Sequence, residues 1–377
     1  MHEAHAALLC LGLAALLHLS GRRQRRRPPS VLPPLLEHIN LNIPCERTAR
    51  DFYVTLGGAV NPVTTNWRQL HINIGASQWH LLHSASRPDA TPPGVPMRTP
   101  QIWPGMLELW TTEPLPKLHM RLARVHATCP PPGPPPIGDD EIAGRFGLAG
   151  RWPLVPTLSP SGDRLLCACP FGNRLEVREA PAAFAPEGSH PGGVGNLVAL
   201  RRLVCPIRPG AAAAVADFFS RVLGCPAALL LGGDDVYEED GDGDEEGAPP
   251  RCVVTFASGQ TATFIECADA PPADAYEVDE PKHGYHLALY VDSHAAFGKA
   301  FVAAAAAGCL FSNPRFEGGP PQFSNAMTYE LALECGQFRV RDVRDGAGAL
   351  VLMLELEIRS PRHVSWPLGN KPRPSPS

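Results

Sequence analysis

One pattern of residues occurs twice in this chain, about 165 residues apart. The first copy runs from Leu36 to Ile43 as a short alternating strand, and an amphipathic stretch that stops at Gly57 follows it. The second copy runs from Leu200 to Ile207 and is followed by a similar stretch that stops at Gly224. A fixed internal period marks a duplicated structural unit, so the architecture must contain each element at least twice.

Each copy extends into two units made of a strand, a helix and further strands. The later units begin near Gly105, Val198 and Tyr285, because an alternating apolar segment at each point precedes a segment with helical spacing. In the fourth unit we expect strands at 329–335, 337–343 and 350–358 after a helix at 293–307. Four such units predict an α+β fold of two domains, each formed by two paired units with a concave half-barrel sheet.

Proline-rich and glycine-rich segments set the predicted boundaries. We expect a leader at 1–32, a first domain at 33–180, a linker at 181–195, a second domain at 196–360 and a tail at 361–377. A long loop at 233–249 interrupts the second domain, and its nine carboxylates between 234 and 246 predict a solvated, self-repelling segment. No helical pattern flanks this run, so a calcium-binding loop is rejected.

Charge and cysteine content narrow the functional classes. The net charge is −5 and no basic face is evident, so nucleic acid is not an expected partner. The eleven cysteines lack paired spacing, and most lie in apolar runs, which favours core packing over a disulfide framework.

The amino terminus contains an apolar run at residues 6–19 that is followed by five arginines at 22–27. The run is short for a spanning helix, and basic residues follow it instead of preceding it. We therefore expect a membrane tether, or an organellar or secretory leader, in preference to a cytoplasmic location.

Several motifs make the chain resemble the vicinal oxygen chelate superfamily, which includes glyoxalase I, extradiol dioxygenases and bleomycin-binding proteins. The resemblance covers residues 35–360. It is carried by Leu36-Glu37-His38-Ile39, Asp51-Phe52-Tyr53, Ser77-Gln78-Trp79-His80-Leu81, Pro170-Phe171-Gly172-Asn173-Arg174-Leu175-Glu176-Val177 and Tyr285-His286-Leu287-Ala288-Leu289-Tyr290-Val291. It implies ligands for a divalent metal on the first and last strands of paired units.

Carried over to the first domain, the resemblance implies His38, His80 and Glu176 as ligands of zinc, nickel or iron. Glu176 would also be the catalytic proton carrier. The family commonly has a histidine on the fifth strand, where this chain has Glu108 nearby and no histidine. A strand histidine such as His38 is also often a hydrogen-bonded core residue, so this reading stays open beside the metal site.

The second domain offers a poorer ligand set. Arg202 stands at the first-strand position, and only His286 and Glu355 remain as ligands. Arg202 could pair with Glu355 or with an anionic ligand.

The leading hypothesis is a metal-dependent lyase or dioxygenase that acts on a small oxygen-bearing organic molecule, as a monomer or homodimer. The alternative is a non-catalytic module of the bleomycin-resistance type, in which apolar cavities lined by residues such as Trp67, Trp79 and Trp110 bind a hydrophobic small molecule. A third hypothesis is a membrane-tethered scaffold whose acidic loop binds a basic partner.

Overall fold

The computed structural model describes residues 32–66, 68–85, 100–128, 155–185, 190–231, 249–274, 285–314 and 326–363. The segments predicted as leader, membrane tether and acidic loop, together with Trp67, lie outside these ranges. In the described part of the chain, no helix is both long and apolar enough to cross a bilayer.

The described residues form four successive units. The first contains β1 (Leu35–Cys45), α2 (Glu46–Leu56), β2 (Ala59–Val60), β3 (Gln69–Ile74) and β4 (Ser77–Ala85). The second contains β5 (Met106–Thr111), α3 (Leu115–Thr128), β6 (Thr157–Leu158), β7 (Leu165–Ala168) and β8 (Arg174–Glu179). The third contains β9 (Leu197–Ile207), α5 (Ala212–Arg221), β10 (Ala227–Leu230), β11 (Arg251–Thr255), a 3-10 turn (Ala257–Gly259) and β12 (Thr261–Glu266). The fourth contains β13 (His286–Tyr290), α6 (His294–Ala306), α7 (Tyr329–Cys335), β14 (Gln337–Arg344) and β15 (Leu350–Arg359).

One element differs in type from the sequence prediction. Residues 329–335 form helix α7 and not a strand. The Thr328 side chain caps its start by accepting a bond from the Leu331 amide, and Gly336 ends it with φ of 71°. A threonine N-cap and a left-handed glycine C-cap are standard helix boundaries, and they outweigh the apolar alternation between them.

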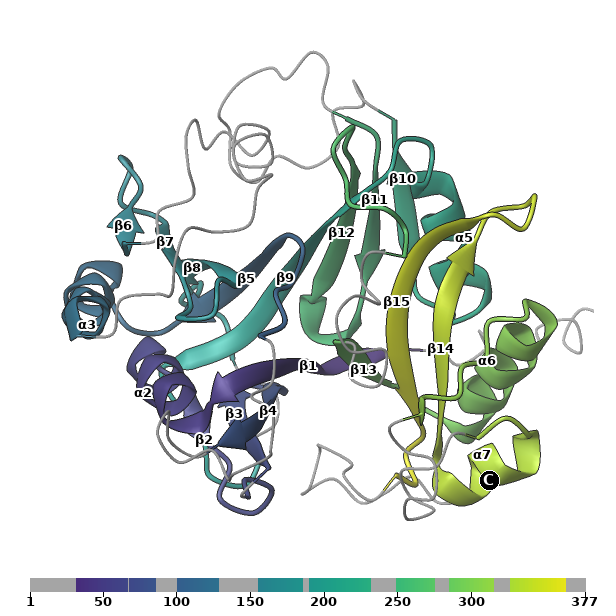
Figure 1. The fold of residues 1–377 in the computed structure, drawn as a ribbon, viewed down its shortest axis with the longest axis horizontal. Coiled ribbons are helices and arrows are strands. Elements are labelled where there is room, and N and C mark those ends of the chain that lie inside the picture. The colour runs from purple at the N-terminus through teal and green to yellow at the C-terminus, as the bar shows by residue number, and fades with distance from the viewer. Residues whose placement is uncertain are drawn as a thin grey trace, which may run out of the picture. The chain divides into compact units, whose positions relative to one another are not determined.

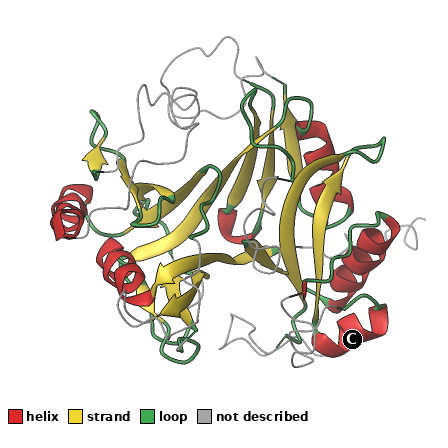
Figure 2. Cartoon of the chain, in the orientation of Figure 1, coloured by secondary structure: helices red, strands yellow, loops and turns green. Residues whose placement is uncertain are grey.

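The strands form two mixed sheets, which confirms the predicted α+β class (Figures 1 and 2). Sheet A has the order β14-β15-β13-β1-β4-β3-β2, and sheet B has the order β10-β11-β12-β9-β5-β8-β7-β6. Within each unit the first strand lies parallel to the last, as a helical crossover requires. Two units then join through an antiparallel pair of first strands, β1 with β13 and β5 with β9.

The pairing of units departs from the expected domain organisation. The first unit joins the fourth, and the second joins the third, so each sheet takes strands from both 33–180 and 196–360. The physical reason is that all four first strands have the same alternating pattern. That pattern specifies which face of a strand is buried but does not specify its partner.

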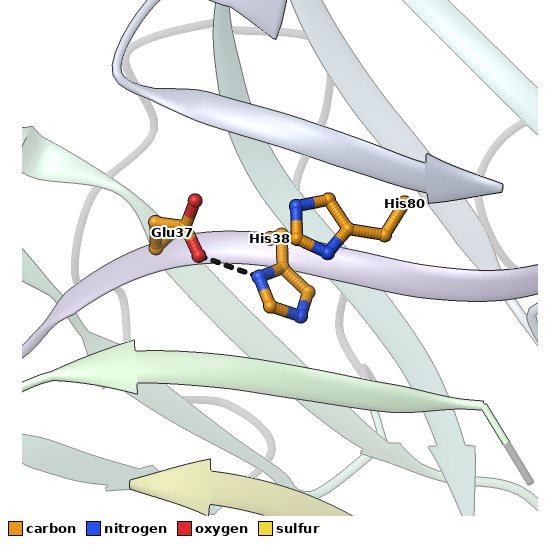
Figure 3. Close-up of side chains that lie close together, drawn as sticks. All are labelled: Glu37, His38 and His80. Carbon is orange, nitrogen blue, oxygen red and sulfur yellow. Dashed lines mark hydrogen bonds and ion pairs between the residues drawn. The ribbon is translucent and has the colours of Figure 1, made fainter. Parts of the chain in front are cut away.

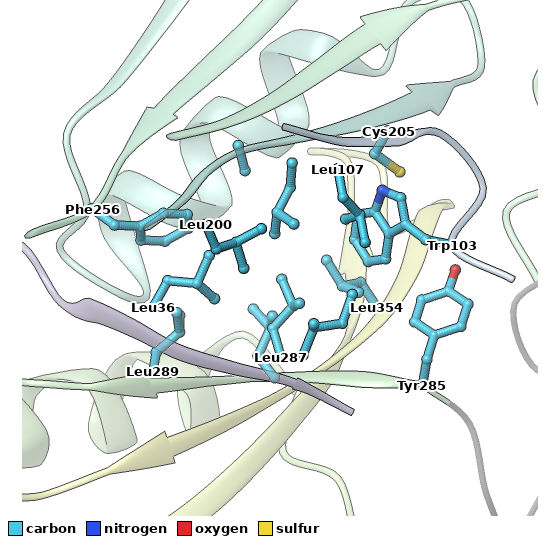
Figure 4. Close-up of a cluster of buried hydrophobic side chains, with 14 of the residues drawn as sticks. Leu36, Trp103, Leu107, Leu200, Cys205, Phe256, Tyr285, Leu287, Leu289 and Leu354 are labelled. Atoms are coloured by element: carbon cyan, nitrogen blue, oxygen red, sulfur yellow. The ribbon is translucent and has the colours of Figure 1, made fainter. Parts of the chain in front are cut away.

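The main core lies between the two sheets. Leu36, Leu287 and Leu289 of sheet A meet Leu107 and Leu200 of sheet B there (Figure 4). At the junction, the buried Gln260 side chain donates to the carbonyls of Leu36 and Leu200 at 3.1 and 3.2 Å. Because side chains alternate along a strand, the residues between these leucines point away from the shared core. Each sheet therefore has one face in the shared core and one face directed away from it.

Candidate metal centre on sheet A

The face of sheet A that points away from the shared core is polar yet buried. On β1, Ile39 and Leu41 belong to the core, whereas His38, Asn40 and Asn42 point to the opposite face and are only 1 to 3% exposed. Burial of so many polar groups is costly unless they are hydrogen-bonded or ionically paired. This face is therefore the candidate functional site of sheet A.

A β-bulge places two consecutive residues of β1 within this cluster. The register of β1 against β13 shifts between Leu36 and His38, so Glu37 is the extra residue. As a result, Glu37 Oε2 lies 2.5 Å from Nδ1 of His38. Figure 3 shows the two side chains facing each other. Without the bulge, neighbouring side chains would point to opposite faces.

Three ligand-type atoms converge beside this pair. His38 Nε2 lies 3.3 Å from Nε2 of His286 on β13, and His286 Nε2 lies 3.5 Å from Oε2 of Glu357 on β15. All three atoms lie within 4.8 Å of one another. Two ligands of one ion at about 2.0–2.2 Å are themselves roughly 3 Å apart, so two histidines and one carboxylate at this spacing could hold zinc, nickel or ferrous iron.

A second group, Glu37 with His38 and His80, is a poorer metal site. The 2.5 Å separation of Glu37 Oε2 from His38 Nδ1 is that of a short hydrogen bond. It is too short for two atoms that share one ion. Glu37 is better described as an orienting carboxylate, because an Nδ1–H donated to it leaves the lone pair on His38 Nε2.

Two buried arginines surround the carboxylates of this face. Arg339 donates to Glu355 and, at 2.8 Å, to Oε2 of Glu357. Arg359 donates to Oε1 of Glu357 at 2.7 Å and lies 3.2 Å from Glu37 Oε2. Glu355 also accepts two bonds from the Asn313 side-chain amide. With all of these groups ionised, the two cations and three carboxylates would carry a net charge of −1, which an added divalent ion would convert to +1.

Burial and these charges move the pKa values in opposite directions. Burial favours a raised pKa for Glu357, but Arg339 and Arg359 overcome it and hold that pKa well below its usual range. Burial raises the pKa of Glu355 despite Arg339. For His38, burial and the nearby Arg359 hold the pKa well below 6.5, so the ring is neutral, as a metal ligand must be.

Three imidazole rings stack on the sheet beside the three ligand atoms. The ring centroid of His80 on β4 lies 3.6 Å from that of His38 and 3.8 Å from that of His71 on β3. Burial lowers the pKa of His80 well below 6.5 and lowers that of His71 to about 3. Nε2 of His80 lies 3.0 Å from Oε1 of Gln78. Neutral rings can stack closely here without electrostatic repulsion.

The three ligands expected from the sequence are not all brought together. His38 and His80 stack on sheet A, but Glu176 lies on β8 of sheet B, where Arg178 donates to it at 2.7 Å. The reason is the pairing of units, since β5 joins β9 and carries β8 into the other sheet. The expected grouping of Glu176 with His38 is therefore not found.

Other site expectations also need correction. Arg202 pairs with Glu108 at 2.7 Å on sheet B and not with Glu355. Trp79 lies on the core face of β4, where it contacts Tyr53. Every cysteine of the described ranges is buried, in keeping with a packing role.

Sequence reasoning missed several residues of this face. His190 and His363 fell in the segments predicted as linker and tail, yet both are buried. Nε2 of His190 lies 3.9 Å from Glu37 Oε1, and Nδ1 of His363 lies 2.9 Å from the Tyr290 hydroxyl. The sequence signal for both was a histidine outside the predicted strands. Nothing in the sequence indicated that its side chain would fold back onto sheet A.

Comparison with known proteins found similarity of this chain to solved structures only. No protein-family profile matches it, and no curated protein was found to be similar to it. Among solved structures, glyoxalase I from Zea mays matches with 9% identity and a TM-score of 0.46, over 87% of this chain and 92% of that one. A putative dioxygenase from Bacillus subtilis matches with 12% identity and a TM-score of 0.41, over 88% and 86% of the two chains.

A third similar structure is the cppA protein from Streptococcus pneumoniae, with 11% identity and a TM-score of 0.37. It covers 88% of this chain and 100% of that one. At these identities and TM-scores the similarity assigns no activity.

Proposed function

We propose that sheet A carries a divalent metal centre formed by His38, His286 and Glu357, and that the chain is a metal-dependent enzyme. The observation that supports the proposal most is the convergence of three ligand atoms within 4.8 Å, with the Nδ1 atom of His38 held by Glu37. Two histidines and one carboxylate leave coordination positions open for a substrate. The proposed substrate is a small organic molecule with adjacent oxygens.

The protein's own groups prepare this centre. Glu37 orients the His38 ring, and Arg359 holds Oε1 of Glu357 so that Oε2 points toward His286. A bound divalent ion would supply Lewis-acid polarisation of a substrate oxygen. Arg339, which contacts both Glu355 and Glu357, keeps these carboxylates in one arrangement. In this proposal Glu357 takes the ligand role expected of Glu176.

A non-catalytic binding module is the second candidate. It is favoured by one observation: Arg339 and Arg359 both pair with Glu357, so this carboxylate already has cationic partners in the protein itself. In that case the polar face would bind a small polar ligand through groups such as His80 and Asn313.

Metal stoichiometry separates these two functions. The full-length chain is purified without chelator and its content of zinc, nickel and iron is measured by mass spectrometry. We expect about one ion per chain, lost in His286→Ala and in Glu357→Gln. Glu176→Gln, which changes the matching carboxylate on sheet B, is the control and should keep the ion.

Absence of metal in the purified chain, with no uptake of added zinc, nickel or iron, would refute the metal centre and favour the binding module. Loss of metal in Glu176→Gln but not in Glu357→Gln would instead favour the ligand set first expected from the sequence. Circular dichroism of each variant shows whether its fold persists.

A further inference from the structure

Both halves of the duplication contain the same β-bulge. In sheet A the extra residue is Glu37, between Leu36 and His38. In sheet B the register of β9 against β5 shifts between Leu200 and Arg202, so Arg201 is the extra residue. Leu36-Glu37-His38 and Leu200-Arg201-Arg202 therefore occupy equivalent places, with the same pairing pattern and different side chains.

The last strands are also equivalent. Glu357 lies level with Ala288, which lies level with His38. Glu176 lies level with Glu108, which lies level with Arg202. Two residues further along β15 and β8, Arg359 and Arg178 occupy matching positions.

The arginine–glutamate pair is the same in both copies. Nε of Arg359 lies 2.7 Å from Oε1 of Glu357, and Nε of Arg178 lies 2.7 Å from Oε1 of Glu176. This pair therefore belongs to the shared scaffold and does not by itself indicate a metal centre.

What distinguishes sheet A is a second bond from the same arginine. Arg359 Nη1 lies 3.2 Å from Glu37 Oε2, the oxygen that also contacts His38 Nδ1. In sheet B the matching bulge residue is Arg201, a cation that cannot accept a bond from Arg178. The bridge from the last-strand arginine to the bulge residue exists only in the copy that has histidine at the first-strand position.

The guanidinium of Arg359 is also fixed from a third side. Its Nη1 lies 3.3 Å from the Tyr290 hydroxyl, which in turn lies 2.9 Å from Nδ1 of His363. Arg359 is only 7% exposed. A planar fork held at three points can set the directions of two carboxylates at once, which a lysine ammonium cannot do in the same way.

We propose that Glu37 and Arg359 are positioning residues of the sheet A centre. Arg359 holds the carboxylate of Glu37 beside His38 and the carboxylate of Glu357 beside His286. The three ligand atoms are thereby arranged before an ion binds. The inference rests on the proposed function, because it assigns these two residues a role toward that metal. It assigns neither of them as a ligand.

A simple electrostatic role for Arg359 predicts the opposite result. A cation close to the centre repels a divalent ion, so neutralising it should tighten metal binding. Positioning predicts weaker binding, both in Arg359→Gln and in the charge-conserving Arg359→Lys, because lysine cannot bridge the two carboxylates in the same geometry.

The test is a titration of the metal-free full-length chain with Co²⁺, followed by absorption, and with Zn²⁺ in competition with a chelating dye. We expect Arg359→Lys and Glu37→Gln each to weaken affinity by about 10- to 100-fold while one ion still binds per chain. The Co²⁺ spectrum should change in both variants. Arg178→Lys on sheet B is the matched control and should leave both readouts unchanged, and urea unfolding of each variant reports its stability separately.

The outcomes separate the two proposals. If the wild-type chain binds neither Co²⁺ nor Zn²⁺, the proposed function is refuted and this inference falls with it. If the wild-type chain binds metal and Arg359→Lys and Glu37→Gln bind with unchanged affinity, only the positioning role is refuted. Tighter binding by Arg359→Gln would likewise overturn it, in favour of a purely repulsive role.

Discussion

Replacement of Arg339 by methionine tests how much the polar face of sheet A depends on its ion pairs. Arg339 is only 2% exposed and binds two buried carboxylates, those of Glu355 and Glu357. Removing one partner of a buried ion pair costs about 3–5 kcal/mol, because a charge is left without compensation. In the variant, Glu357 still has Arg359 as a partner and Glu355 still has Asn313. We therefore expect the free energy of unfolding to fall by the lower end of this range, about 3 kcal/mol at pH 7.5.

The loss should shrink as the pH falls. Burial already raises the pKa of Glu355 above its usual value, and loss of Arg339 removes the main group that opposes this shift. A carboxyl group with a raised pKa binds more protons in the folded state, so its contribution to stability falls as pH rises above the unfolded pKa of about 4.3. The difference between variant and wild type is therefore expected to be larger at pH 7.5 than at pH 5.

Urea unfolding of the full-length chain at both pH values measures this difference. Arg202→Met on sheet B is the control, because Arg202 is 38% exposed and its pair with Glu108 is worth about 1 kcal/mol or less. A loss below about 1 kcal/mol for Arg339→Met, or a loss that grows toward pH 5, would refute the reasoning.

Three further predictions concern the junction of the sheets and the acid stability. Gln260→Leu removes this donor from the Leu200 carbonyl and from the Leu36 carbonyl, which keeps the Ser77 hydroxyl, and should cost roughly 1–3 kcal/mol in urea unfolding; a neutral effect would contradict the junction role. Gly75→Ala would place Cβ 1.9 Å from the Val198 carbonyl oxygen at φ of +60° and should cost at least about 2 kcal/mol, whereas Gly162→Ala, with open space around it, should cost less. Burial lowers the pKa of His363 to about 3, so the unfolded state binds more protons between pH 3 and 6.5 and stability falls as pH falls through that window. His363→Gln should reduce the slope of the free energy of unfolding against pH by up to about 1.4 kcal/mol per pH unit. An unchanged slope would show that His363 does not cause the loss of stability in acid.

The element types were largely predictable from the sequence because local signals and tertiary environment agree. The first strands alternate, and Gly57, which stops the first helix, adopts φ of 114° at the C-cap as expected of such a stop. The exception is 329–335, where alternation suggested a strand but the caps at Thr328 and Gly336 define a helix. Alternation over so few residues is compatible with one face of a short helix, so the cap residues were the better signal.

The residue types and strand positions of the candidate site were predictable from the sequence, but the particular residues were not. A histidine of a first strand and a carboxylate of a last strand lie together on one face, but they are His38 and Glu357, whereas the sequence indicated His38 with Glu176 and His286 with Glu355. Glu176 was assigned the role because it occupies the matching last-strand position in the neighbouring unit. It lies in the other sheet, beside Arg178, because of the way the units join.

Side-chain chemistry alone could not have decided between the two pairings. If the first unit joined the second, His38 and His80 would share a sheet with Glu108 and Glu176, which is also an acceptable ligand set for a divalent ion. The opposite sheet would then combine Arg202 with His286 and the β15 carboxylates, which is electrostatically acceptable as well. Because period-two alternation leaves the partner strand open, a duplicated chain of this kind defines alternative site compositions, and only the antiparallel contact of β1 with β13 selects the one that contains His286.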